Sequence, residues 1–153
     1  MEDLVQGALA PPFLGKDQNG NLIKLDDFKG GRLILFFYPK DNTPGCTAEA
    51  CNLRDHYQEL KDKGFSLVGV SPDGPSSHQR FINKYSLPFP LIADEEKEIL
   101  TAYGVWGEKK MYGKSYLGVL RTTFVIDGTG RIERIYSKVN TKDHAAQILA
   151  EES

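Results

Sequence analysis

The chain has 153 residues, of which 26% are charged, and its formal net charge is −2. This length and balance are typical of one globular domain that buries its own hydrophobic core, so we expect a single domain over residues 1–153. The sequence has no cluster of basic residues and no apolar run near the ~20 residues that span a bilayer. These absences argue against nucleic-acid binding and against membrane insertion.

The number of cysteines and the first residues of the chain indicate the cellular compartment of the protein. Two cysteines are too few for a disulfide framework, which favours a reducing compartment. The opening Met-Glu-Asp-Leu has neither the basic start nor the apolar stretch of a secretory signal. We therefore expect a cytoplasmic protein.

The first part of the chain predicts three strands. Residues 10–17 and 22–25 form two short strands joined by a turn that contains Asn19-Gly20, a strong hairpin signal. After a loop at 26–31, residues 32–38 form an uninterrupted apolar and aromatic run, which is typical of a buried strand.

An amphipathic helix follows this strand. Its apolar side chains recur every three or four residues, at Cys46, Ala50, Leu53, Tyr57 and Leu60. Basic residues and a glycine predict its end near residues 61–64, and residues 65–70 predict a second buried strand. A strand, a helix and a strand of these lengths form a right-handed parallel crossover.

The middle of the chain continues the alternation. We expect a helix at 75–85, a short strand at 91–93 and a helix at 95–103. Residues 107–118 are rich in glycine and polar side chains, so we expect a long loop there.

The chain closes with a hairpin of residues 122–127 and 132–137 around a Gly-Thr-Gly turn, followed by a helix at 142–151. Strands and helices that alternate and then end in a hairpin and a helix predict an α/β sandwich with a mixed central sheet.

The chemistry is concentrated at the start of the helix that follows the first buried strand. Thr43 suits the N-cap, Pro44 the first helical position, and Gly45 and Cys46 the first turn. Unpaired backbone N–H groups and the positive end of the helix dipole converge there, and both favour a thiolate. Cys46 is therefore a candidate activated nucleophile.

The second cysteine, Cys51, follows five residues later. In a regular helix it lies about 140° around the axis from Cys46, with Cα atoms about 8–9 Å apart. Because disulfides need Cα atoms within about 7 Å, the two cysteines cannot bond while the helix is intact. A disulfide between them would require the first turns to unwind.

These residues carry a resemblance to a known family. Pro39-xxx-Thr43-xx-Cys46 resembles the active-site signature of the peroxiredoxins, and Thr43-Pro-Gly-Cys-Thr-Ala-Glu-Ala-Cys51 is similar to the peroxiredoxin Q group, also called bacterioferritin comigratory protein. The likeness covers nearly the whole chain in order, through the segments 69–73, 85–90, 103–108 and 121–127.

The resemblance implies a thioredoxin-like fold with an N-terminal hairpin extension, and a thiol peroxidase activity. In that activity Cys46 attacks a hydroperoxide and becomes a sulfenic acid, and Cys51 then resolves it as an intramolecular disulfide. Thioredoxin or a related dithiol reduces the disulfide. Pro39, Thr43, Gly45 and Arg121 bind the substrate. Thr43 and Arg121 are also catalytic, as donors to the departing oxygen, and Arg121 supplies a permanent cation beside the thiolate.

Simpler explanations exist for each of these residues. A cysteine at a helix start is often a small buried hydrophobe, and Cys51 is open to interpretation as a free thiol. The simpler role of Pro39 is to end the strand, and that of Thr43 is to cap the helix. For Arg121 the simpler explanation is a surface side chain whose apolar stem is buried. Glu49, one turn into the helix, is a candidate for tuning its N-terminal end.

Two other functions stay open on the same residues. A thioredoxin-type disulfide oxidoreductase would need Cys-x-x-Cys, whereas four residues separate these cysteines. A non-enzymatic redox sensor on the same fold would keep the reactive cysteine.

We expect no metal and no cofactor. Cys46, Cys51 and His56 fan around the helix, whereas a metal site needs clustered ligands. His56, His78 and His144 are each expected to be exposed helix residues. Because an intrachain resolving cysteine removes the catalytic need for a partner, we expect a monomer.

Overall fold

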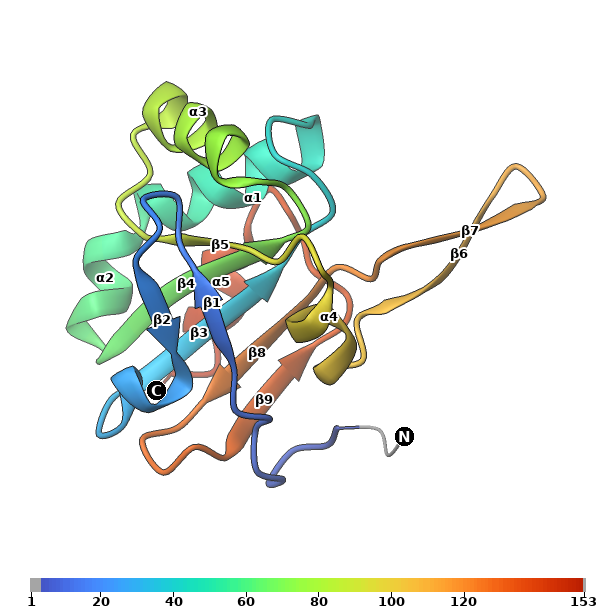
Figure 1. Cartoon of the computed structure of the whole chain (residues 1–153). Coiled ribbons are helices and arrows are strands. Elements are labelled where there is room, and N and C mark those ends of the chain that lie inside the picture. The colour runs from blue at the N-terminus through green and yellow to red at the C-terminus, as the bar shows by residue number, and fades with distance from the viewer. Residues whose placement is uncertain (1–3, 153) are drawn as a thin grey trace.

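The computed structural model describes residues 4–152 and is built on a seven-stranded mixed sheet in the order β2-β1-β5-β4-β3-β8-β9, as Figure 1 shows. The strands of the sheet are β1 (Leu14–Lys16), β2 (Leu22–Lys24), β3 (Arg32–Phe37), β4 (Phe65–Ser71), β5 (Leu91–Ala93), β8 (Thr122–Ile126) and β9 (Ile132–Tyr136). The helices are α1 (Pro44–Asp55), α2 (Tyr57–Asp62), α3 (Pro75–Tyr85), α4 (Glu98–Ala102) and α5 (His144–Leu149), with a short 3-10 turn at Leu25–Phe28.

Three central strands, β3, β4 and β5, run parallel, and β8 pairs antiparallel with β3. Along β3 the side chains alternate between two cores: Leu33, Leu35 and Phe37 face one, and Ile34 and Phe36 face the other. The uninterrupted apolar run of this strand follows from its position, because both faces of the sheet are covered.

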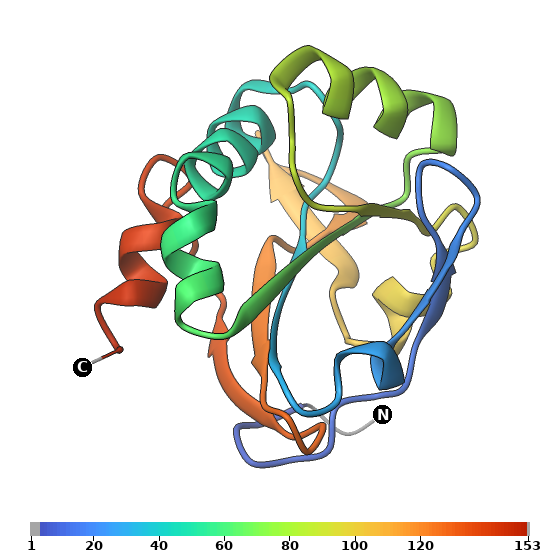
Figure 2. The same cartoon turned by 90° about the vertical axis from the view of Figure 1, so that its left-hand side faces the viewer.

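Helices cover the two faces unequally. One core receives apolar side chains of α1, α2, α3 and α5, while α4 packs on the opposite core through Ile99 and Leu100. Figure 2 shows α1, α2 and α5 gathered on one side of the sheet. The expected apolar face of the cysteine helix is confirmed, because Cys46, Ala50 and Leu53 are all buried there.

The N-terminal hairpin extends the sheet beyond β5. Strands β1 and β2 pair antiparallel, and Lys16 of β1 pairs with Ala93 of β5. Gly20 in the connecting turn has a φ of 80°, which glycine adopts without steric cost. The first strand is shorter than the expected 10–17.

The expected loop at 107–118 is wrong. Strands β6 (Trp106–Met111) and β7 (Lys114–Val119) form a separate two-stranded hairpin that projects from the body, as Figure 1 shows. Tyr112 and Gly113 make its two-residue turn with φ values of 53° and 77°, the left-handed backbone that twisted hairpins favour. Trp106 packs against the core, whereas Tyr112 is fully exposed at the tip.

Three helices differ from the expected bounds. The single expected helix after β3 is divided at His56, whose ψ of 14° leaves the helical range. Helix α4 begins only at Glu98, because Lys97 takes a left-handed conformation. Helix α5 begins at His144 and ends at Leu149. No helix in the described part of the chain is long and apolar enough to cross a membrane.

Candidate active site

A short loop connects the C-terminal end of β3 to the start of α1. Thr43 occupies the N-cap position in extended backbone (φ −94°, ψ 157°), and Pro44 is the first helical residue, as the sequence predicts. The Thr43 hydroxyl donates to the carbonyl of Lys40 at 2.8 Å, so the side-chain cap of the helix is not formed. Cys46 lies in the first turn and is 2% exposed.

The loop before α1 is held by Asp41. The Tyr38 hydroxyl donates to its Oδ1 at 2.6 Å, and the Ser77 hydroxyl donates to Oδ2 at 2.8 Å. His78 Nδ1 lies 2.6 Å from the same Oδ2, and the Asp41 backbone N–H donates to Asp73 at 2.7 Å. The expectation that His78 is exposed is wrong: it is fully buried, with Nε2 donating to the carbonyl of Ile92.

Arg121, at the junction of β7 and β8, brings the site together. Its Nη2 donates to Cys46 Sγ at 3.3 Å, and its Nη1 donates to Glu49 Oε1 at 2.6 Å. The guanidinium also passes close to the backbone of Gly45, where an added Cβ would lie 3.2 Å from Nη2. Arg121 therefore bonds Cys46 and Glu49 and lies close to Gly45, all three in the first two turns of α1.

The charges in this cluster are largely withdrawn from water. Burial lowers the pKa of Arg121, but the adjacent Cys46 and Glu49 outweigh burial and raise its pKa above the ordinary value, so it stays a cation. Burial raises the pKa of Glu49 to about 7, against the opposing effect of Arg121. Glu49 thus titrates near neutral pH within contact of the arginine that faces the thiol.

His144 is the second histidine whose expected exposure is wrong. It is fully buried, with Nε2 2.8 Å from the Thr123 hydroxyl oxygen and Nδ1 2.8 Å from Gln147 Oε1. Its Nε2 lies 4.0 Å from Glu49 Oε2. His56 is only half-buried.

Cys51 is a half-buried free thiol in the same continuous helix as Cys46, which is also free. The next residue, Asn52, fastens this part of α1 to the start of α5: its Oδ1 accepts the Ala145 N–H at 2.8 Å and its Nδ2 donates to the Lys142 carbonyl at 3.1 Å. Pro39 is half-buried between β3 and this helix.

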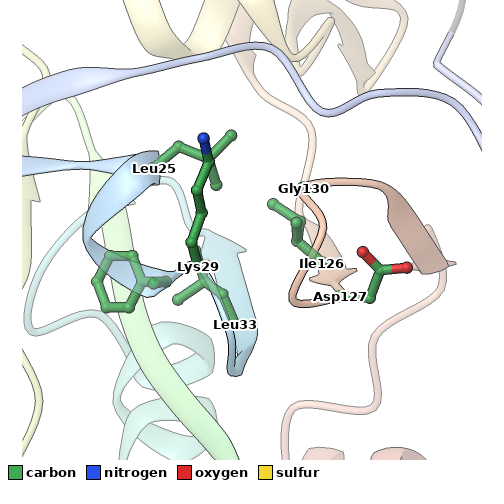
Figure 3. Close-up of a pocket in the computed structure, with 7 residues that line it drawn as sticks. Leu25, Lys29, Leu33, Ile126, Asp127 and Gly130 are labelled. Atoms are coloured by element: carbon green, nitrogen blue, oxygen red, sulfur yellow. The ribbon is translucent and has the colours of Figure 1, made fainter.

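Two hollows in the surface differ in their relation to Cys46. A groove of about 560 Å³ is lined by Arg121 and Thr122 together with the cationic Lys109 and Lys138, so it leads to the arginine that contacts Cys46. The pocket in Figure 3 lies between Leu33, at the opposite end of β3, and the turn after β8, and holds only about 20 Å³. That volume suits one water molecule and no substrate.

Sequence reasoning missed three groups of the site. Glu49 was a weak candidate, whereas His144, Asp41 and Asn52 had no assigned role. Asp41 had a usable signal, because an acidic residue directly after a buried strand and before a helix start is well placed to fix the turn. Along the described part of the chain, only Gln147 is a local partner of His144, and the groups that link it to the site come from β8 and α1, through Thr123 and Glu49.

Residues 6–135 match the AhpC/TSA family. The chain belongs to the AhpC/TSA family. Peroxiredoxin Bcp of Bacillus subtilis (strain 168) is 44% identical over 143 residues, which cover 94% of this chain and 91% of the relative.

Solved structures of relatives agree with this assignment. A mutant of Xylella fastidiosa PrxQ superposes with a TM-score of 0.91 at 29% identity, covering 99% of this chain and 96% of that one. A structure of the Xanthomonas campestris bacterioferritin comigratory protein, described in terms of alkyl peroxide reduction, has a TM-score of 0.85 at 34% identity, covering 96% and 94%. The resemblance and the thioredoxin-like fold are confirmed, and the chain is a peroxiredoxin, a thiol peroxidase.

The titration of Glu49 predicts a pH dependence of stability. The folded peroxiredoxin holds the Glu49 proton up to about pH 7, whereas the ordinary pKa is 4.5. Between these values the folded state binds more protons than the unfolded chain, so stability falls as pH rises. Glu49→Gln removes this titration, and its free energy of unfolding relative to the parent should rise by about 1–3 kcal/mol from pH 5 to pH 8.

Chemical denaturation of both proteins at the two pH values measures this difference. Glu96→Gln, which removes one carboxylate from an exposed position, is the matched control and should show no such change. A Glu49→Gln difference that stays constant between pH 5 and pH 8 would mean that Glu49 is already ionised throughout this range.

Proposed function

We propose that this peroxiredoxin reduces hydroperoxides with Cys46 as its nucleophile. The observation that carries the proposal is the 3.3 Å contact of the Arg121 guanidinium with Cys46 Sγ at the N-terminus of α1. A permanent cation and the unpaired N–H groups of a helix start both favour the thiolate.

In the first step the Cys46 thiolate attacks one oxygen of the hydroperoxide. An S–O bond forms, the O–O bond breaks, and the departing oxygen takes up one proton and leaves as water or an alcohol. The sulfur is oxidised by two electrons to a sulfenic acid. Arg121 and the N–H groups of Gly45 and Cys46 are placed to stabilise the charge that develops on the departing oxygen.

Thr43 and Pro39 have supporting roles in this proposal. The Thr43 hydroxyl donates to the carbonyl of Lys40, and in the proposed mechanism it donates to the peroxide instead. Pro39, half-buried after the C-terminal end of β3, is proposed to help shape the substrate site. Organic hydroperoxides are included among the substrates, since the Xanthomonas campestris relative is described by its alkyl peroxide reduction and the groove beside Arg121 has room for an alkyl group.

The second step forms a disulfide within the chain. The Cys51 thiol attacks the sulfenic sulfur of Cys46, an S–S bond forms, and the oxygen leaves as water. Because both cysteines lie in one regular helix, the start of α1 must unwind first. Thioredoxin or a related dithiol then reduces the disulfide and is itself oxidised. With resolution inside one chain, the enzyme is proposed to act as a monomer, in the reducing cytoplasm.

Turnover of hydrogen peroxide with a thioredoxin recycling system tests the activity. Cys46→Ser should abolish it, because serine supplies no anion at neutral pH. Cys51→Ser should still consume one equivalent of peroxide per chain but fail to recycle through the disulfide. More than a few per cent of the parental rate in Cys46→Ser would refute the assignment of the nucleophile.

Arg121→Met tests the role of the cation. Methionine keeps much of the apolar stem but removes the charge and both donated hydrogen bonds. We expect the rate of peroxide oxidation, measured by stopped flow, to fall by about 100-fold or more, the scale on which one oxyanion donor acts. Arg131→Met removes an exposed arginine that bonds Gly7 and is the matched control. A rate close to the control would exclude Arg121 from the reaction.

Hydrogen exchange tests the unwinding. Amides of residues 47–51 should exchange faster in the peroxide-oxidised protein than in the dithiol form, because the disulfide cannot close across an intact helix. Amides of α3 provide an internal control and should be equally protected in both forms. Equal protection of residues 47–51 would mean that Cys51 does not resolve Cys46, and that an external thiol does so directly.

A further inference from the structure

One buried atom of the site has an unexplained environment. Glu49 is fully buried, and its Oε1 accepts a hydrogen bond from Arg121. Its Oε2 is also buried and has no hydrogen-bond partner among residues 4–152. A buried carboxylate oxygen without a donor is costly, so either a proton or a nearby donor is expected there.

His144 is the group that faces this oxygen, with Nε2 4.0 Å away. Its tautomer follows from its partners. Gln147 Oε1 also accepts the backbone N–H of Asn140, so this atom is an acceptor and His144 Nδ1 must donate to it. In the neutral ring Nε2 is therefore unprotonated and accepts from the Thr123 hydroxyl. A further proton can be added only at Nε2, the nitrogen nearest Glu49.

The surroundings of the pair contain one permanent charge. Arg121 faces Glu49 from the β7–β8 junction and contacts Cys46 on its other side. From β9, the Tyr136 ring packs edge-on against His144 at 5.6 Å. Lys142 and Asp143, which precede His144, are exposed to water. Cys46, Arg121, Glu49 and His144 thus form a row in which neighbouring groups can carry opposite charges.

We propose that His144 is a positioning residue of the peroxidatic site, which shares a proton with Glu49 and so leaves the charge of Arg121 available to the Cys46 thiolate. The inference rests on the proposed function, because it takes Cys46 as the reacting thiolate. With the proton present, Glu49 and His144 together are neutral and Arg121 is balanced only by Cys46. Without it, the Glu49 carboxylate balances Arg121, and the thiolate loses that support.

The titration of the two groups agrees with this arrangement. Burial raises the pKa of Glu49 to about 7, while burial and the charge of Arg121 lower the pKa of His144. Between the lowered pKa of His144 and the raised pKa of Glu49, the two groups together therefore hold one proton.

The proton count of the pair then follows the state of Cys46. A thiolate beside Arg121 strengthens proton binding by the pair, and conversion to a neutral sulfenic acid weakens it. The pair thus tends to release a proton when the thiolate is consumed, the same step in which the departing oxygen takes one up.

The test uses opposite substitutions in a Cys51→Ser background, with the thiolate measured by the rate of Cys46 alkylation against pH. His144→Phe removes both ring nitrogens but keeps the ring that packs on Tyr136. Its alkylation midpoint should move up by about one pH unit, a roughly tenfold loss of thiolate below the midpoint. Glu49→Gln removes the opposing charge, and its midpoint should move down. His56→Phe, which replaces the half-buried histidine at the end of α1, should leave the midpoint unchanged.

A purely structural role predicts a different pattern. If His144→Phe and Glu49→Gln move the midpoint in the same direction, or if neither moves it, the proposal is wrong. His144→Gln covers the case in which the Phe variant does not fold, since it retains a polar side chain and should give an upward shift as well. A His144→Gln midpoint at the parental value would also overturn the proposal.

A second measurement does not depend on peroxide turnover. The His144 ring resonances, followed by NMR against pH, should titrate at lower pH in Cys46→Ser than in the parent, because no thiolate supports the proton. Identical titrations would refute the coupling even if the enzyme reduces peroxide normally. If the titration of His144 depends on Cys46 but the protein has no peroxidase activity, the proposed function is wrong while the coupling between His144 and Cys46 stands.

Discussion

The site depends on one partly buried arginine that links two parts of the fold. Arg121 leaves the start of β8 and donates to Cys46 and Glu49, which lie one turn apart on α1. Burying an ion pair costs desolvation free energy, and removing one partner would leave a buried charge unpaired. The guanidinium therefore joins the first turns of α1 to the start of β8 through contacts with Glu49 and with the thiol of Cys46.

Much of the fold could be predicted because local patterns coincide with burial. The apolar run at 32–37 has no alternation because both faces of β3 are covered, and Cys46, Ala50 and Leu53 recur at helical spacing because α1 buries one face. The β6–β7 hairpin could not be predicted in this way. Its side chains from Lys114 to Leu117 are exposed, so no core imposes a pattern on them, and only Gly113 in its tight turn marks it.

The residues of the site also fall into two groups: those that the sequence identifies, and those whose surroundings depend on distant partners. Cys46, Thr43 and Pro44 could be placed because the rules for a helix start are local, and Arg121 was found through the family resemblance. His144 and His78 were both expected to be exposed, since histidine in a helix is usually solvated. Their burial depends on partners distant in sequence, Thr123 for one and Asp41 for the other. Such partners are visible only once the chain has folded.

The two anchors of the helix start have a consequence for the speed of the catalytic cycle. Asp41 is fixed to α3 and to the connection between β4 and α3 on one side of the reactive segment, and Asn52 is fixed to the start of α5 on the other. If α1 opens in the disulfide step proposed above, the freed chain is a short loop with both ends still in their native places. Its entropy gain is small, since loop entropy grows only with the logarithm of length. Re-forming about two helical turns between fixed ends takes on the order of a microsecond or less, so refolding would be far faster than an encounter with a protein reductant at cellular concentration.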